Sequence, residues 1–416
     1  MTAAWDLGAS ARFTQALTLG IVGMAYSAFA TRSTIGWPGL LGVVGALVFL
    51  AAFCLIAKRA ELEWRGLLPI SLLVFLSWST LSIAWSDYQW VSLGSVAYQL
   101  AFAFLAVFVA LTRDLIQIVR AFGDILRVVL AASLVLEIMS GLLLDTPFLF
   151  LSILGNLDNG GPIQGLLGTR NQLGLVALVA LVTFFTELRT KSVPRPLAVA
   201  SLALAVLTIL LTRSPVTFGA LVVVAIAAAS IIGLRSLNAT RRRAWQFVLL
   251  AGSVMMLAIL FVARGRVISL LNAGSEFEFR YRLWRSTLDF TPDNALEGFG
   301  WTGYWRQGLP PFIGIDPFSG PHSSALNAFL DVWLQLGLVG LLAFIALVGL
   351  AFVRSWLLAS NRRSIVFLWP ALILVALLVT SAAESSALVE FGWLTLVVCV
   401  VKSSQNLSWR ARLPEN

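Results

Sequence analysis

The fold is decided by the stretch LNAFLDVWLQLGLVGLLAFIALVGLAFV at residues 326–353. It is longer than the ~20 apolar residues that a straight membrane-spanning helix needs, and Asp331 is its only charged residue. Backbone polar groups cannot be left unpaired in lipid, so a spanning segment must satisfy them internally. The stretch therefore predicts a transmembrane helix.

Similar apolar runs recur along the whole chain, and the composition agrees with them. Of the 416 residues, 59% are hydrophobic and 12% are charged, against roughly 25% charged residues in soluble domains. We predict an all-α polytopic integral membrane protein with about 12 transmembrane helices and with its fifteen Trp mostly at the membrane interfaces. The predicted spans are 13–30, 36–57, 67–85, 91–111, 125–144, 173–186, 197–212, 216–234, 245–263, 326–353, 365–382 and 387–401.

The two cysteines do not indicate a disulfide or a metal site. Cys54 and Cys399 lie in separate apolar runs with no CxxC motif, which predicts neither a disulfide nor a thiolate metal site.

The basic residues indicate the orientation of the chain in the membrane. With both termini in the cytoplasm, about two thirds of the 29 Lys and Arg, including every lysine, fall on inner segments, as the positive-inside rule requires. The net charge of +9 is thus explained by topology and not by nucleic-acid binding. The outer arginines are Arg32, Arg170, Arg213, Arg264, Arg266, Arg280, Arg282, Arg285 and Arg306.

One outer loop is much longer than the others and divides the chain. Helices 1–9 occupy 1–263, a large extracytoplasmic loop occupies 264–325, and helices 10–12 with a cytoplasmic tail occupy 326–416. Loops of this length usually carry function or are disordered. Because this one contains several Trp and Tyr and a helical pattern, we predict that it is ordered and partly helical.

Within this loop, the segment RYRLWR at 280–285 concentrates positive charge. Arg280, Arg282 and Arg285 lie on the side where insertion does not require them, which indicates the capture of an anion. Trp284 is four residues from Arg280 and would share its face on a helix. An amphipathic surface helix is the alternative explanation.

Two further outer arginines stand next to predicted spans. Arg213 lies in the sequence LTRSP at 211–215, a turn so short that its guanidinium must lie near the membrane surface. Arg170 closes the outer loop before a span. Ionisable groups at this depth are costly and tend to be functional, although both arginines could instead reach lipid phosphates.

The only histidine, His322, precedes the stretch at 326–353. Its imidazole suits a general base near neutral pH, and a solvated loop histidine is the alternative. Asn327, Asp331 and Gln335 follow at spacings of four and form one polar stripe on the helix. Asp331 could orient His322 or pair with an arginine. Glu384 is a second outer carboxylate, and either carboxylate could be purely structural.

At these residues the chain resembles the O-antigen ligase/O-antigen polymerase family of bacterial membrane glycosyltransferases. Each motif is weak alone, and their order and spacing carry the resemblance. The matching pieces are Arg280-x-x-x-Trp284, Pro292, Gly298-Phe299-Gly300, the segment NAFLD at 327–331, the segment QLGLVG at 335–340, the segment GTRNQLG at 168–174 and the segment LTRS at 211–214.

The resemblance implies an enzyme of the bacterial inner membrane whose active site faces the periplasm. The family transfers a glycan from undecaprenyl diphosphate to an acceptor hydroxyl and needs no divalent metal or other cofactor. The resemblance implies that Arg170, Arg213 and Arg280 bind the diphosphate, with His322 as the base. From their positions, Arg282 is a further diphosphate ligand and Asp331 a second catalytic candidate. Secondary candidates are Trp284, Asn327 and Glu384.

One departure from the family pattern bears on the acceptor. Many members have His directly before the Asn that opens this helix, where this chain has Leu326, and a second histidine common in ligases is absent. This favours a polymerase of O-antigen or exopolysaccharide over a ligase that uses lipid A core as acceptor. Membrane lipids and a chain-length regulator are further candidate partners. A transporter or flippase of lipid-linked oligosaccharides is the alternative of another class, and a scaffold would leave the arginines unexplained.

Overall fold

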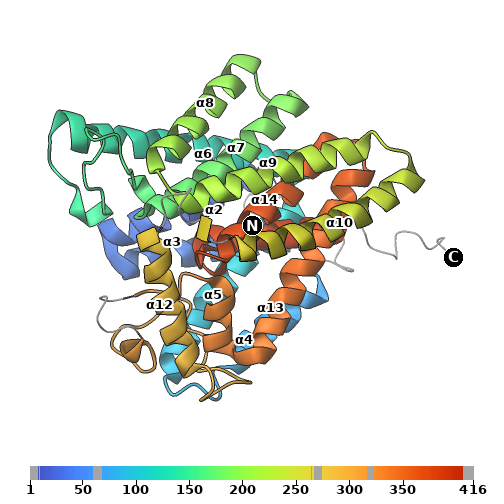
Figure 1. Cartoon of the computed structure of the whole chain (residues 1–416). Helices are drawn as coiled ribbons and strands as arrows, with labels where there is room; N and C mark the ends of the chain where they lie inside the picture. The colour runs from blue at the N-terminus through green and yellow to red at the C-terminus, as the bar shows by residue number, and fades with distance from the viewer. Residues whose placement is uncertain are drawn as a thin grey trace.

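The computed structural model describes residues 8, 10–59, 68–263, 265–266, 274–315 and 322–405. Within these ranges the regular structure is helical, and the only extended pairing is an isolated bridge between Phe148 and Ile153. Figure 1 shows the helices packed into one bundle. The predicted all-α class is therefore confirmed for the described part of the chain.

Each predicted apolar run overlaps a helix. Seven helical segments, namely 28–57, 89–112, 115–143, 170–190, 195–212, 215–235 and 328–361, are long and apolar enough to cross a membrane among the residues described. A polytopic membrane protein is thus supported, and twelve spans stay a prediction. The helices that overlap the runs are α2 (Ala11–Tyr26), α3 (Ala28–Ala57), α4 (Ile70–Leu81), α5 (Gln89–Thr112), α6 (Leu115–Ile138), α7 (Arg170–Thr190), α8 (Arg195–Thr212), α9 (Pro215–Arg235), α10 (Ala239–Val262), α13 (Ala328–Asn361), α14 (Leu368–Ser381) and α15 (Glu390–Gln405).

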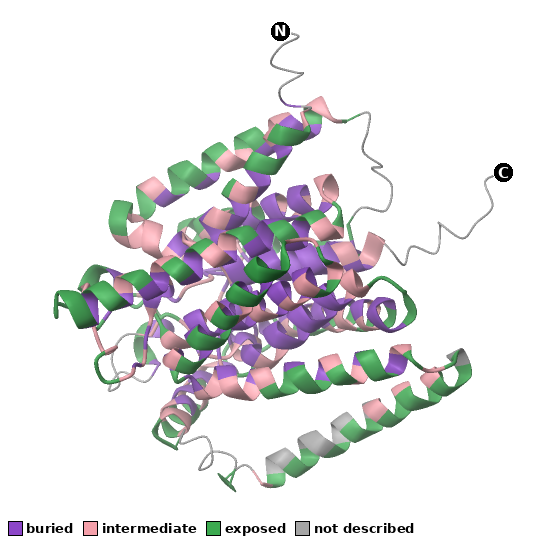
Figure 2. Ribbon diagram, turned by 90° about the horizontal axis from the view of Figure 1, so that it is seen from above, coloured by how far each residue is buried: buried purple, intermediate pink, exposed green. Residues whose placement is uncertain are grey.

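Burial separates the inner helices from the outer ones. Buried residues gather on the central helices in Figure 2, whereas the outer helices carry long exposed stretches. Large apolar side chains such as Phe49, Val128 and Val222 are exposed there, as expected for surfaces that face lipid rather than water. Trp369 and Trp393 are fully buried in α14 and α15. The predicted interfacial role is therefore wrong for these two tryptophans.

Indole hydrogen bonds explain how such large side chains are accommodated inside the bundle. Trp369 donates from Nε1 to Thr183 Oγ1 of α7 at 2.9 Å. Trp393 donates from Nε1 to the carbonyl of Gln99 on α5 at 3.2 Å. A buried indole N–H needs such a partner, so these bonds fix α14 against α7 and α15 against α5.

The helix α13 is not continuous, although its sequence is. Asn327 caps its N-terminus by accepting from the backbone N–H of Phe329 and Leu330 at 3.0 and 3.2 Å. Gly337 then adopts a φ of 65°, a left-handed conformation inside the helix. The preceding segment packs into this kink, where Leu338 N–H donates to the carbonyl of Ala295 at 2.9 Å.

We expect Gly337→Ala to destabilise the fold because a Cβ at this position would collide with the backbone of Leu296 and Glu297. The left-handed backbone alone costs about 1–2 kcal/mol for a residue with a Cβ. Thermal unfolding of the detergent-solubilised protein should show a lower Tm. Gly349→Ala on the same helix is the control, since its Cβ would meet no atom within 4 Å. Equal Tm values for both variants would contradict this role of the kink.

The predicted long loop contains the helix α12 (Gly274–Phe290) and a small apolar cluster. Trp284 donates from Nε1 to the carbonyl of Ala325 at 3.0 Å, which ties α12 to the start of α13. The segment is thus helical in part, as predicted, while its position in the periplasm and the division of the chain at its ends stay predictions. Arg264 and residues 267–273 and 316–321 of the predicted loop lie outside the described residues. The cluster consists of Leu283, Trp305, Phe312, Ile315, Ala325 and Leu334.

Candidate functional site

Arg280 lies at the centre of a polar network on the inner face of α12. Arg280 is only 7% exposed. Its guanidinium donates from Nε to the carbonyl of Ala383 at 3.2 Å, from Nη1 to Glu276 Oε2 at 3.0 Å and from Nη2 to Glu384 Oε1 at 2.9 Å. A buried charge requires such pairing, so the position of this guanidinium is firmly fixed.

Arg170 joins the same network through the other carboxylate oxygen of Glu276. The sequence predicted that Arg170 and Arg280 meet, and the structure brings them together across one shared carboxylate. Glu276 was not among the predicted site residues. Its position four residues before Arg280 is the signal that could have identified it, because residues at this spacing share a helix face.

Glu384 extends the network to two more helices. Its Oε1 also accepts from Asn171 Nδ2 at 2.6 Å, and Asn171 Oδ1 accepts from Ser214 Oγ at 2.7 Å. Ser214 in turn caps α9 by accepting from the N–H of Thr217 at 3.1 Å. The start of α7, the α8–α9 turn, α12 and the turn after α14 therefore meet at one end of the bundle.

Arg213 lies beside this network and leaves its charge exposed. It ends α8 with a φ of 46°, and its Nη2 would be 2.8 Å from a Cβ built on Gly160. Within the described ranges no carboxylate forms an ion pair with it. Its sequence neighbour Ser214 belongs to the network, while the guanidinium of Arg213 itself lies at Gly160.

Arg282 is also exposed but lies elsewhere on α12. Two residues along an α-helix correspond to a rotation of about 200°, so Arg282 and Arg280 lie on nearly opposite sides. The described contacts of the network do not include Arg282. The spacing within RYRLWR thus divides its arginines between two faces of the helix.

His322 lies alongside α12, near the network. Its ring centroid is 5.5 Å from that of Phe279, the residue before Arg280. The bond from Trp284 to Ala325 holds the intervening segment against the same helix. The predicted base therefore contacts α12 one residue before Arg280 in the sequence, and its proximity to the arginines and its role in catalysis stay predictions.

Asp331 is fully buried and binds the neighbouring turn. Both of its carboxylate oxygens accept the N–H of Ala325 at 3.1 Å, and Oδ2 accepts from Ser385 Oγ. Asn327 reaches the same turn, since its Nδ2 donates to the carbonyl of Ala382 at 3.2 Å. These contacts hold the 382–385 turn, and with it Glu384, at the start of α13.

The two carboxylates of the network differ in their burial. Burial raises the pKa of Glu384 above its ordinary value, while the charge of Arg280 and the hydrogen bonds of Asn171 and Arg280 act in the opposite direction. The Glu276 side chain is 23% exposed, against 10% for Glu384. Glu276 is therefore the more accessible of the two carboxylates.

Comparison with protein-family models gives a match that covers part of this network. Residues 199–345, about a third of the chain, match the family model described as O-antigen ligase. This range includes Arg213, Arg280, His322 and Asp331, and Arg170 lies before it. No curated protein matches the chain.

Proposed function

We propose that this protein transfers a glycan from undecaprenyl diphosphate to a sugar hydroxyl, on the periplasmic side of a bacterial inner membrane, as the match of residues 199–345 to the O-antigen ligase family model suggests. A polymerase of O-antigen or exopolysaccharide is the favoured form, and a ligase acting on lipid A core would use the same donor chemistry. The observation that supports the proposal most is the joining of Arg170 and Arg280 through Glu276, beside the exposed Arg213.

The arginines would act on the leaving group. As the bond between the anomeric carbon and the diphosphate oxygen breaks, the electron pair stays on that oxygen and negative charge grows. Cationic groups fixed where charge develops lower the barrier, especially where water is partly excluded. Arg280 is held in place by Ala383 and Glu384, and Arg170 and Arg213 would complete a clamp for the two phosphates.

The remaining chemistry is removal of a proton from the acceptor. The acceptor oxygen attacks the anomeric carbon, and its proton passes to the imidazole of His322. One direct displacement inverts the anomeric configuration, so a product with retained configuration would contradict this step. Asp331 and Glu384 are the other candidate bases, and the bonds of Asp331 to Ala325 and Ser385 favour a positioning role for it.

Transfer by the purified protein in detergent tests the proposal directly. The donor is undecaprenyl-diphosphate oligosaccharide without ATP, and the products are longer chains and free undecaprenyl diphosphate. Lipid A core added as acceptor distinguishes a ligase, which would attach the glycan to it. Movement of intact donor across liposomes without bond cleavage would instead support a transporter.

For His322→Ala we expect a loss of kcat on the order of 10²-fold, in the range that a placed general base contributes. The donor KM should change little, because the imidazole acts on the acceptor hydroxyl. Full activity of this variant would show that His322 is not the base and would leave Asp331 and Glu384 as the candidates.

A further inference from the structure

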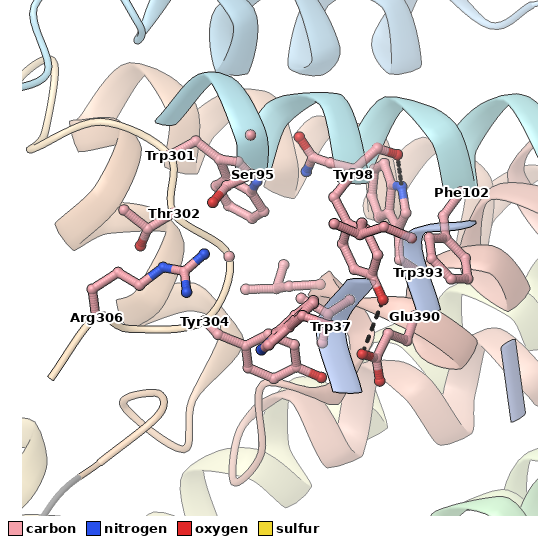
Figure 3. Close-up of a pocket in the computed structure, with 16 residues that line it drawn as sticks. Trp37, Ser95, Tyr98, Phe102, Trp301, Thr302, Tyr304, Arg306, Glu390 and Trp393 are labelled. Carbon is pink, nitrogen blue, oxygen red and sulfur yellow. Dashed lines mark hydrogen bonds between the residues drawn. The ribbon is translucent and has the colours of Figure 1, made fainter. Parts of the chain in front are cut away.

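A separate cavity of about 260 Å³ lies between α3, α5, the 301–306 segment and residues 388–393 (Figure 3). Its described lining residues include no member of the network around Arg280. Aromatic rings dominate its walls. They are Trp37, Tyr98, Phe102, Trp301, Tyr304 and Trp393.

The side chain of Gln99 gives this cavity an unusual polar group. Gln99 is 3% exposed and lines the cavity, and neither its Oε1 nor its Nε2 has a hydrogen-bond partner among the described residues. An unpaired buried amide is costly. The backbone carbonyl of Gln99 is held by Trp393, and its side-chain amide carries two N–H donors and one acceptor at the wall of the cavity.

Two charged groups at the inner part of the cavity, Arg32 and Glu390, are already paired with each other. Glu390 Oε1 accepts from Tyr98 Oη at 3.1 Å and from Arg32 Nη1 at 3.2 Å. The Arg32 guanidinium also stacks over the rings of Trp37 and Tyr304, 5.0 Å from each centroid. Figure 3 shows Arg306 on the side opposite Glu390, and Arg306 is exposed. The inner part of the cavity therefore offers hydrogen bonds and aromatic faces, and no unpaired cation for an anion.

We propose that this cavity binds one neutral sugar ring. A sugar presents a face of C–H groups to aromatic rings and hydroxyls that can pair with the Gln99 amide. A lipid chain would leave that amide unpaired. The volume lies below the roughly 300–1,000 Å³ of pockets for drug-sized ligands, which suits a single ring rather than an oligosaccharide.

The chain connects this cavity to the network around Arg280. Glu384 binds Arg280, and Glu390, at the end of the same short stretch, lines the cavity. The segment between them is a turn and the 3-10 helix Ser386–Leu388. The inference rests on the proposed function, because that function supplies the sugar. The sugar would belong either to the donor glycan or to the acceptor glycan.

Binding of simple glycosides tests the cavity without any transfer reaction. The probes are methyl glycosides of glucose, galactose, mannose and N-acetylglucosamine, and the signal is the tryptophan fluorescence of the purified protein. We expect a saturable change with at least one probe, weakened at least tenfold in Gln99→Leu and Gly94→Leu. Gly94 lines the cavity and a Cβ there meets no atom within 4 Å, so a leucine can begin there without backbone strain and extend into the space.

The control is Leu100→Val, on an exposed face of the same helix, which should bind like the unaltered protein. Gln99→Leu removes an unpaired buried amide and should not lower Tm, so weaker binding cannot be attributed to misfolding. No response to any probe, or equal responses in all variants, would overturn the proposal.

Kinetics in the transfer assay then separate the two sources. A rise in the donor KM of Gln99→Leu with unchanged kcat assigns the sugar to the donor, and a rise in the acceptor KM assigns it to the acceptor. Glycoside binding without any transfer by the unaltered protein would refute the proposed function and leave the sugar site standing. Transfer of the glycan without any glycoside binding would refute the sugar site and leave the proposed function standing.

Discussion

Arg280→Ala is expected to reduce transfer on the order of 10³-fold, the range seen when a fixed cationic group or hydrogen-bond donor is removed from a developing charge. The guanidinium is buried and held by Ala383, Glu276 and Glu384, so no neighbouring side chain can replace it. The measurement is initial release of undecaprenyl diphosphate at saturating donor. Arg285→Ala, an exposed position on the same helix, should retain nearly full activity.

Folding must be separated from catalysis in this experiment. Removing Arg280 leaves Glu384 buried without its cation, which costs about 3–5 kcal/mol. The double variant Arg280→Ala/Glu384→Gln removes the uncompensated charge and should recover much of the lost Tm. If the double variant is as stable as the unaltered protein and also as active, Arg280 has no part in the reaction.

Arg213→Ala is expected to lose transfer to a similar extent, on the order of 10³-fold, with no comparable loss of stability. Arg213 is exposed and has no ion-pair partner in the part of the chain that the structure describes, so its removal strands no buried charge. Expression and Tm should stay close to those of the unaltered protein while activity falls.

The matched control is Arg189→Ala, an exposed arginine near the other end of α7. It should lower neither transfer nor Tm. Arg213→Lys tests geometry separately from charge, because an ammonium cannot form the paired hydrogen bonds of a guanidinium. Activity of Arg213→Ala equal to that of Arg189→Ala would remove Arg213 from the site.

The length of the apolar runs predicted the helices well, because lipid forces long apolar runs into internally hydrogen-bonded structure. It could not predict the kink at Gly337, where the tertiary approach of Leu296 requires a glycine inside an apparently uniform run. Charge placement identified Arg170, Arg213 and Arg280, since insertion does not account for them.

Tertiary contacts account for what the sequence did not predict. Helical phase separates Arg282 from Arg280, although both lie in one basic motif. The pairing of Arg32 with Glu390 brings together α3 and α15, and no local pattern links two residues so far apart. The aromatic cavity escaped prediction for a related reason: its tryptophans come from several segments, and their abundance alone suggested the membrane interface.

The carboxylate of Glu276 would have a consequence for turnover in the proposed reaction. It pairs with both Arg170 and Arg280, and it could take them back as a diphosphate product leaves. Product release would then proceed by replacement of one anion with another, without leaving two adjacent cations unscreened. An enzyme that extends a chain repeat by repeat must discharge its spent carrier at every cycle, and this carboxylate would keep that step from becoming the slowest one.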